Sequence, residues 1–261
     1  SRYILGRTYY CLDELPRALE MYNEAITHAD TTSADCDFAK LSRVYAQRAA
    51  IFHSQIQPRS QLKDLRMAEY YAKKGKDTLM AIECYSQQAD AYYFMHIEDS
   101  AIYIQEHCAQ LFLEIKRPDR AAQNICTTIS SLINKGDYER ARFYCYQYET
   151  YSGFFNEKGV IEHGKEIYYY LKGKLYLSVD ELDSAEYLFR KELRVGKDLN
   201  NQIAGCKGLQ EVFEKKKISD SISKYASLGY ELNDSAYSLS EMQNIQKFQA
   251  SYNYNHQKRT T

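Results

Sequence analysis

The chain has 261 residues and a nearly balanced charge, with 34 lysines and arginines against 35 aspartates and glutamates. This balance gives no overall attraction toward nucleic acids or anionic membranes, and no apolar run approaches the ~18–20 residues that a membrane-spanning helix needs. Gly and Pro number only 11 and 3, whereas Tyr occurs 26 times and Trp is absent. So few chain-breaking residues disfavour a many-turned sandwich or barrel and favour long helices.

Small and aromatic residues recur at a fixed spacing, starting in the first predicted helix. Gly6 lies 12 positions before Ala18, and Tyr9 follows Gly6 by three. The spacing of 12 returns between two further pairs of small residues, Ala89 with Ala101 and Gly173 with Ala185. Weaker copies are carried by Tyr45, Ala49, Leu65 and Ala68, by Ile129, Leu132, Ala141 and Cys145, and by Leu209, Val212, Ser221 and Tyr225. Such a repeat predicts an array of similar structural units.

Packing between two antiparallel helices explains this spacing. A Gly or Ala in one helix lets its partner approach closely, and the aromatic residues fill the gap against the next hairpin. Apolar residues in each copy recur at i, i+3, i+4 and i+7, as one face of a helix requires. Polar turns separate the paired helices at 12–15, 136–138 and 179–182. The sequence therefore predicts an all-α chain of six helical hairpins, with no sheet of three or more strands.

These residues resemble the tetratricopeptide repeat (TPR) family over nearly the whole chain. The resemblance implies a right-handed superhelix, or α-solenoid, of about six TPR-like hairpins followed by a C-terminal helix. The packing residues at positions 6, 49, 89, 129, 173 and 209 are 43, 40, 40, 44 and 36 positions apart, compared with about 34 in the standard repeat. We therefore expect helices or loops longer than the norm and an irregular superhelix.

A second resemblance lies near the C-terminus. Tyr225 and Leu228 precede the segment YELNDS at 230–235, which leads into a polar helix at 240–258. This junction is similar to the TPR sensor region of Bacteroidetes membrane-associated regulators, in which repeats run into a signalling helix. It predicts a repeat array at 1–235 and an amphipathic signalling helix with a polar tail at 236–261. The resemblance implies a position on the extracytoplasmic face of a membrane-bound regulator, with a membrane anchor and an output domain outside these residues.

The predicted C-terminal helix carries an apolar stripe formed by Leu239, Met242, Ile245, Phe248 and Tyr252. Such a stripe packs back on the last hairpin or pairs with the same helix of a second chain. The first outcome predicts a monomer and the second a dimer through the C-terminal helix. The polar tail at 253–261 has no apolar partner positions and is expected to fray.

The sequence contains no motif that indicates catalysis or cofactor binding. It lacks a phosphate-binding loop, a dinucleotide fingerprint, a zinc-protease helix and a nucleophile elbow. The segment GKDT at 75–78 lacks the upstream glycine and the preceding strand of a phosphate-binding loop, so we interpret it as a turn between helices. His107 and Cys108 point about 100° apart on a helix and cannot face one metal. We therefore expect no enzyme activity, no catalytic residue, no cofactor and no metal.

Cysteines and basic runs also favour structural interpretations. The seven cysteines show no paired spacing, which predicts reduced core thiols and favours a cytoplasmic location. The basic runs at 73–76 and 215–217 lie near helix ends, where cations are favoured by the helix dipole. No aromatic interleaving or helix-turn-helix pattern accompanies them, so we expect these residues to bind no nucleic acid.

A ligand-binding groove is expected on the inner, concave wall of the array, which is lined by the first helix of each hairpin. Residues flanking each small packing residue turn toward this groove and mix aromatic anchors with single charges, a composition suited to a protein or peptide segment. The predicted contact residues are Tyr3, Arg7, Tyr10, His53, Asp90, Tyr93, Tyr170, Lys174 and Phe213. Among them, Arg7, Tyr93 and Tyr170 are the leading candidates.

The sequence thus predicts a non-enzymatic module that binds proteins or peptides. The leading interpretation is the sensory input domain of a bacterial regulator. The alternative is a cytoplasmic peptide-responsive transcription factor whose DNA-binding part lies outside these residues. A secretion signal and an apolar span in the flanking sequence would favour the sensor, whereas an upstream helix-turn-helix would favour the transcription factor.

Overall fold

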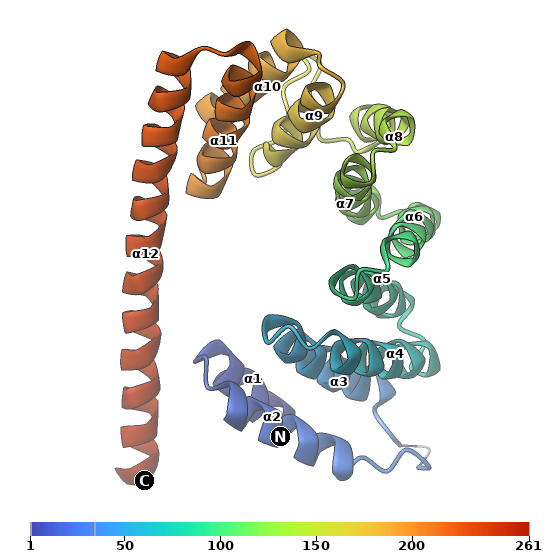
Figure 1. The fold of residues 1–261 in the computed structure, drawn as a ribbon. Coiled ribbons are helices and arrows are strands. Elements are labelled where there is room, and N and C mark those ends of the chain that lie inside the picture. Colours follow the sequence, from blue (N-terminus) through green and yellow to red (C-terminus); the bar gives the residue numbers. More distant parts are fainter. Residues whose placement is uncertain (1, 34, 261) are drawn as a thin grey trace. The chain divides into compact units, whose positions relative to one another are not determined.

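The computed structural model describes residues 2–33 and 35–260, with side chains described up to residue 250. Within these residues the chain forms an all-α fold of twelve helices without a β-strand (Figure 1). The helices are α1 (Arg2–Cys11), α2 (Leu15–Thr27), α3 (Phe38–Ser54), α4 (Pro58–Lys74), α5 (Thr78–Phe94), α6 (Glu98–Glu114), α7 (Pro118–Lys135), α8 (Tyr138–Tyr151), α9 (Ile167–Ser178), α10 (Leu182–Val195), α11 (Leu199–Lys216) and α12 (Ser219–Thr260). Neighbouring helices pack in sequential order, so the predicted all-α helical repeat is confirmed.

The close approach of paired helices is confirmed at two glycines. A Cβ atom added to Gly6 would lie 2.5 Å from the Tyr22 ring, and one added to Gly173 would lie 2.6 Å from the Phe189 ring. Each contact joins the two helices of one hairpin, α1 with α2 and α9 with α10. The second-helix alanines of the 12-residue spacing, such as Ala18, are also buried, although the atoms nearest the two glycines belong to Tyr22 and Phe189. The spacing therefore reflects helix–helix packing.

The helices from α3 to α6 follow a regular register of 20 residues. Each is 17 residues long and is followed by a three-residue turn. The central turn residue has a left-handed backbone at Ile56, Lys76, His96 and Lys116, with φ between 53° and 59°. In the first of these turns, the Ile56 and Gln57 amides donate to the carbonyls of His53 and Phe52, which is the Schellman pattern that closes a helix. Two helices and two turns give the 40-residue repeat.

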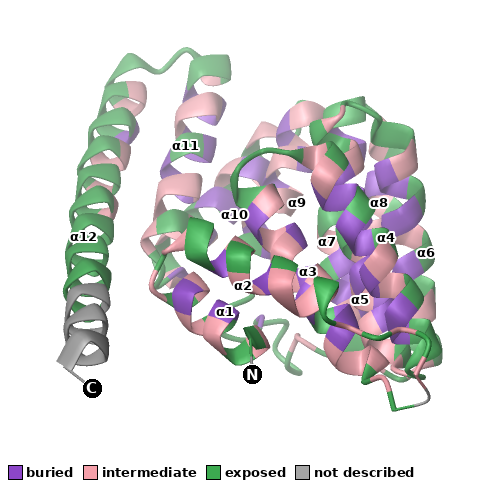
Figure 2. Ribbon diagram, turned by 90° about the horizontal axis from the view of Figure 1, so that it is seen from below, coloured by how far each residue is buried: buried purple, intermediate pink, exposed green. Residues whose placement is uncertain are grey.

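The chain divides into two compact units, residues 1–117 with 244–261 and residues 118–243. In the first unit, the core begins with a cluster around Tyr9, Tyr22, Val44 and Ile51, which joins α1, α2 and α3. Buried residues lie along the facing sides of the paired helices (Figure 2). The handedness of a superhelix spanning both units stays a prediction.

The second unit contains an insertion between α8 and α9. Residues 152–166 form a loop with an isolated β-bridge between Phe155 and Ile161. The Phe155 ring packs edge-on against Tyr148 of α8 and Tyr168 of α9, which stack on each other with ring centroids 4.4 Å apart. This loop explains why packing residues 129 and 173 are 44 positions apart although α8 and α9 are short.

The last helix differs from the prediction. It runs for 42 residues from Ser219 to Thr260 without a break, so the expected boundary between 235 and 236 falls inside α12. Near its start, the Tyr225 ring stacks on Phe213 of α11 at 5.6 Å. Side chains from 237 to 250 are all exposed. The polar tail at 253–261 lies outside the residues whose side chains are described.

The apolar stripe of α12 is not packed against the array. Leu239, Met242, Ile245 and Phe248 are all exposed, and Tyr252 lies beyond the described side chains. Residues three apart on a helix lie about 60° apart around its axis, so these four positions wind over about half the circumference. The stripe therefore follows a curved path around α12. Packing back is not observed, and pairing with a second chain stays a prediction.

No helix among the described residues is both long enough and apolar enough to cross a membrane.

Candidate functional site

In the first unit, part of the predicted groove comes together on α3 and α5, which contact each other directly. The His53 ring packs edge-on against Phe94 at 5.4 Å, and Phe94 in turn contacts the ring of Tyr93. Burial raises the pKa of the half-buried Asp90, and the proximity of His53 partly opposes this shift. His53, Asp90 and Tyr93 therefore form one surface, which we call the first-helix wall.

The three predicted residues on α1 contact each other or the nearby apolar cluster. The Arg7 guanidinium lies 6.0 Å from the centre of the Tyr3 ring, in a cation–π arrangement at the surface. Tyr10 packs against the apolar cluster around Tyr22. Of these residues, Arg7 is the most exposed.

In the second unit, each predicted contact residue already contacts a neighbouring helix. Lys174 Nζ lies 2.6 Å from Glu211 Oε2, which joins α9 to α11. The Tyr170 ring packs against Phe189, with ring centroids 5.7 Å apart. Phe213 is buried in the core and stacks on Tyr225, so it offers little surface to a ligand in this structure. The sequence pattern placed it on the correct helix but did not show that α12 would cover it.

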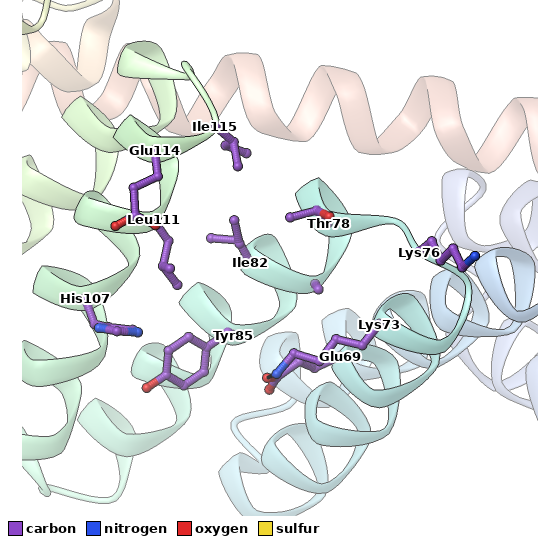
Figure 3. A pocket seen from close by; sticks show the side chains of 11 residues that line it. Glu69, Lys73, Lys76, Thr78, Ile82, Tyr85, His107, Leu111, Glu114 and Ile115 are labelled. Carbon is purple, nitrogen blue, oxygen red and sulfur yellow. Dashed lines mark hydrogen bonds and ion pairs between the residues drawn. The ribbon is translucent and has the colours of Figure 1, made fainter.

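A pocket of about 580 Å³ lies between α4, α5 and α6 in the first unit (Figure 3). Its apolar lining comes from Ala81 and Ile82 of α5 and from Leu111 and Ile115 at the end of α6. Its polar lining consists of Glu69, Lys73, Lys76, Thr78, Tyr85, His107 and Glu114. None of the nine predicted contact residues lines this pocket, because it is formed by the second helices α4 and α6 and by positions of α5 other than the predicted Asp90 and Tyr93.

An ion pair occupies one edge of this pocket. Lys73 Nζ lies 2.5 Å from Glu69 Oε1 one turn away on α4. The second oxygen of Glu69 accepts a hydrogen bond of 2.7 Å from Gln88 Nε2 of α5. Both oxygens of Glu69 are therefore satisfied, and this carboxylate holds α4 against α5.

Aromatic rings form the opposite edge. The His107 ring packs edge-on against Tyr85 and stacks on Tyr103, at 6.0 Å in both cases. Tyr103 is 63% exposed, so the stacked pair extends the pocket onto the surface of α6. Burial is the main cause that raises the pKa of Tyr85 above its ordinary value, so its hydroxyl remains a hydrogen-bond donor. This edge offers flat apolar faces and a hydrogen-bonding hydroxyl.

A second, smaller pocket of about 420 Å³ lies between α1, α3 and the loop that precedes α3. It includes Tyr3 from the predicted groove, together with Arg2, Lys40 and three aspartates of the loop. Asp37 caps α3 by accepting from the Lys40 amide, and Asp30 accepts from Thr32. In the described part of the chain, no three His, Cys, Asp or Glu side chains are grouped to hold a metal ion.

Little of the pocket between α4 and α6 could be predicted from the sequence. Residues 75–77 form a turn between two helices, as predicted, and Thr78 begins α5; the basic run at 73–76 spans the end of α4 and this turn. Leu111 and Ile115 continue the apolar spacing of Cys108 and are indistinguishable from core residues in the sequence. Their accessibility depends on the offset between neighbouring hairpins, which no short motif encodes.

Comparisons with known proteins support the fold. No protein-family model and no curated protein matches the chain. Among solved structures, the chain is similar to the crystal structure of BtubC (BKLC) from P. vanneervenii. The TM-score is 0.64 at 15% sequence identity, and the similarity covers 87% of this chain and 91% of that one. At this identity the similarity shows a shared helical-repeat fold.

Proposed function

We propose that the chain is a non-enzymatic, TPR-like interaction module that binds a protein or peptide segment in the pocket between α4, α5 and α6. The observation that carries this proposal is the apolar lining of the pocket, in which Leu111 and Ile115 are half-buried and which is bordered by aromatic rings and by charges of both signs. Pockets of several hundred Å³ with apolar walls and a few polar groups are typical of binding sites. An apolar side chain of a partner would gain most by covering Leu111 and Ile115.

The polar groups of the pocket support binding more than chemistry. The Glu69 carboxylate is held by Lys73 and Gln88, so it is not placed to act as a general base. Tyr85 has a raised pKa, which opposes formation of a phenolate nucleophile. A binding role needs no reactive group and is met by the apolar surface alone.

For the wider role, we propose the sensory input domain of a bacterial regulator. The supporting observation is α12, whose exposed residues 237–250 extend a helix that begins against α11. A helix of this kind can carry a change in the repeats to a following domain. The alternative is a peptide-responsive transcription factor, and the similarity to BtubC favours neither role because it concerns the fold. Reading the flanking sequence of the full-length gene product discriminates between the two.

The binding proposal can be tested with a displayed library of random 12-residue peptides selected on the intact protein. Dissociation constants of the enriched peptides are then measured for two variants of α6. Leu111→Lys places a charge in the pocket lining, whereas Leu113→Lys changes an exposed leucine outside it on the same helix. We expect the first variant to weaken binding at least 10-fold and the second to leave it unchanged.

Circular dichroism of both variants checks that the helices remain folded. Enriched peptides that bind both variants equally would contradict the pocket as the contact site. If Tyr93→Ala then weakened binding, the first-helix wall would be the site instead. A library that yields no binder would contradict the interaction module itself.

A further inference from the structure

The two ends of the pocket between α4 and α6 carry opposite charges. Lys76 lies at one end, in the turn between α4 and α5, and Glu114 lies at the other, in the last turn of α6 (Figure 3). The apolar residues Ile82 and Leu111 lie between them, on facing helices. The pocket is therefore an apolar floor with a cationic end and an anionic end.

These end charges are available to a partner. The ammonium of Lys73 is already neutralised by Glu69, so Lys76 is the cation that remains at its end. Lys76 is exposed and has no ion-pair partner among the described residues. Glu114 is also exposed, and it accepts a long hydrogen bond of 3.4 Å from the side-chain amide of Gln110 on the same helix. Neither charge is needed to hold the helices together.

Hydrogen bonds of the turn hold the backbone at Lys76 in a defined conformation. Lys76 has a left-handed φ of 59°, and its amide donates to the Lys73 carbonyl at the end of α4. The next residue, Asp77, accepts from the Met80 amide and caps α5. The turn is therefore hydrogen-bonded on both sides, so the Cα of Lys76 holds a defined position beside the pocket.

We propose that the occupant of this pocket is a peptide segment with a bulky apolar side chain between an acidic and a basic side chain, bound in one direction. The acidic side chain meets Lys76, the basic side chain meets Glu114, and the apolar side chain covers the half-buried Leu111. This inference rests on the proposed function and adds the chemistry and direction of the partner. Complementary charges at a rim set orientation and specificity more than affinity, which comes from the apolar contact.

Other ligand classes fit this arrangement less well. A nucleic acid or an anionic lipid surface would be attracted by Lys76 but repelled by Glu114, and Lys73 would offer little because Glu69 neutralises it. A purely apolar ligand would leave both end charges without partners. A segment with both signs of charge is the class that satisfies the two ends together.

Two synthetic, fluorescein-labelled peptides test this inference. They share one composition and differ only in order, with Glu-Gly-Leu-Gly-Lys or Lys-Gly-Leu-Gly-Glu at the centre of a Gly/Ser host. Fluorescence anisotropy with the intact protein measures both dissociation constants. We expect one order to bind about 5-fold more tightly than the other, since each exposed ion pair contributes only modestly.

A double charge exchange provides the decisive variant. Lys76→Glu combined with Glu114→Lys keeps the net charge and changes two exposed side chains. The inference predicts that the preferred order of the peptide is inverted in this variant. A peptide in which Ser replaces the central Leu should bind neither protein measurably.

The possible outcomes separate this inference from the proposed function. If both orders bind equally and Leu111→Lys weakens both, the pocket binds peptides but the directional inference is wrong. If the order preference survives the double exchange, the charges of Lys76 and Glu114 do not set direction and the inference is also overturned. If neither peptide binds at millimolar concentration, both the inference and this pocket as a peptide site are contradicted.

Discussion

The two compact units each bury a carboxyl group, but they stabilise it differently. In the first unit, the Asp64 side chain is 3% exposed, and both its oxygens accept from the Arg48 guanidinium at 2.6 and 2.7 Å. In the second unit, Glu192 is fully buried, and neither of its oxygens has a hydrogen-bond partner among the described residues. Burial, with a smaller contribution from Glu166, raises the pKa of Glu192 to about 8.

This difference shows how one fold tolerates buried acids at different cost. For Asp64, the bidentate Arg48 guanidinium replaces the hydrogen bonds that the carboxylate would make to water. Glu192 avoids the cost of burying a charge by holding its proton at neutral pH. The burial of Asp64 therefore depends on an ion pair, and that of Glu192 depends on pH.

The largest effect is expected from breaking the ion pair. Arg48→Met leaves the buried Asp64 carboxylate without its partner and should lower the free energy of unfolding by about 3–5 kcal/mol. Arg59→Met, an exposed arginine on α4, is the control and should change stability little. Urea denaturation followed by circular dichroism measures both. Equal stability of the two variants would show that the Asp64 charge is compensated in another way.

The pH dependence of the second unit should be the next largest effect. In the folded state Glu192 keeps its proton up to about pH 8, whereas in the unfolded chain it releases the proton near 4.5. The folded state is therefore favoured at low pH, and stability falls as pH rises through this window by up to about 1.4 kcal/mol per unit. Between pH 6 and 8 the loss should reach roughly 2–3 kcal/mol.

Glu192→Gln removes this titration while keeping the shape of the side chain. Comparing urea denaturation of the variant and the parent from pH 5.5 to 8.5 isolates the contribution of Glu192, because the other titrating groups are shared. The free energy of unfolding of the parent, relative to that of the variant, should be greater at pH 5.5 than at pH 8.5. A difference that stays constant with pH would mean that Glu192 titrates normally in the folded protein.

Overpacking at Gly173 should have a smaller effect on the second unit. Its added Cβ would lie 2.6 Å from the Phe189 ring, so Gly173→Leu should cost about 1–3 kcal/mol. Gly229→Ala is the matched control, since its Cβ would make an ordinary contact of 3.4 Å with Cys206 and Ala favours the helix. Thermal denaturation should show a lower melting temperature for the first variant only. An unchanged melting temperature would show that α9 and α10 can separate at no cost.

The smallest effect concerns the turns. The first unit places Ile56 in a left-handed turn where the second unit has Gly136, with φ of 53° and 81°. A branched residue is unfavourable in this conformation, and Ile56 is 68% exposed, so little packing is lost on replacing it. Ile56→Gly should therefore stabilise the first unit by roughly 0.5–1 kcal/mol in urea denaturation. Destabilisation would indicate that the Ile56 side chain makes contacts that outweigh its backbone strain.

The sequence predicted the repeat because helix packing leaves a local signature. Gly6 and Gly173 had to be small, and their distance of 12 from the partner alanine follows from the length of a hairpin. The 20-residue turn register was not predicted, because Ile56 and Lys76 adopt the left-handed conformation that sequence reasoning assigns to glycine. The continuity of α12 was missed for a related reason, since Asn233 and Ser235 resemble a helix boundary but lie inside a helix.

The candidate site was harder to predict than the fold. Its lining comes from three helices that are contiguous in space only after α4 and α6 have packed on α5, and its apolar residues match the core pattern. Conversely, Phe213 looked accessible because nothing in its own hairpin spacing shows that Tyr225 stacks on it. Sequence reasoning identified helix faces, whereas accessibility depends on how neighbouring hairpins are offset.

The most direct test of the proposed binding surface is site-specific photocrosslinking to a peptide enriched from the library. Benzoylphenylalanine is introduced in place of Tyr103, which stacks beside the pocket, or in place of Tyr93 on the first-helix wall, which is 46% exposed. Both positions are accessible, so the comparison depends on where the peptide lies. The account predicts a crosslink from position 103 that Leu111→Lys abolishes, and only background from position 93. A crosslink from position 93 without one from position 103 would contradict it and place the partner on the first-helix wall.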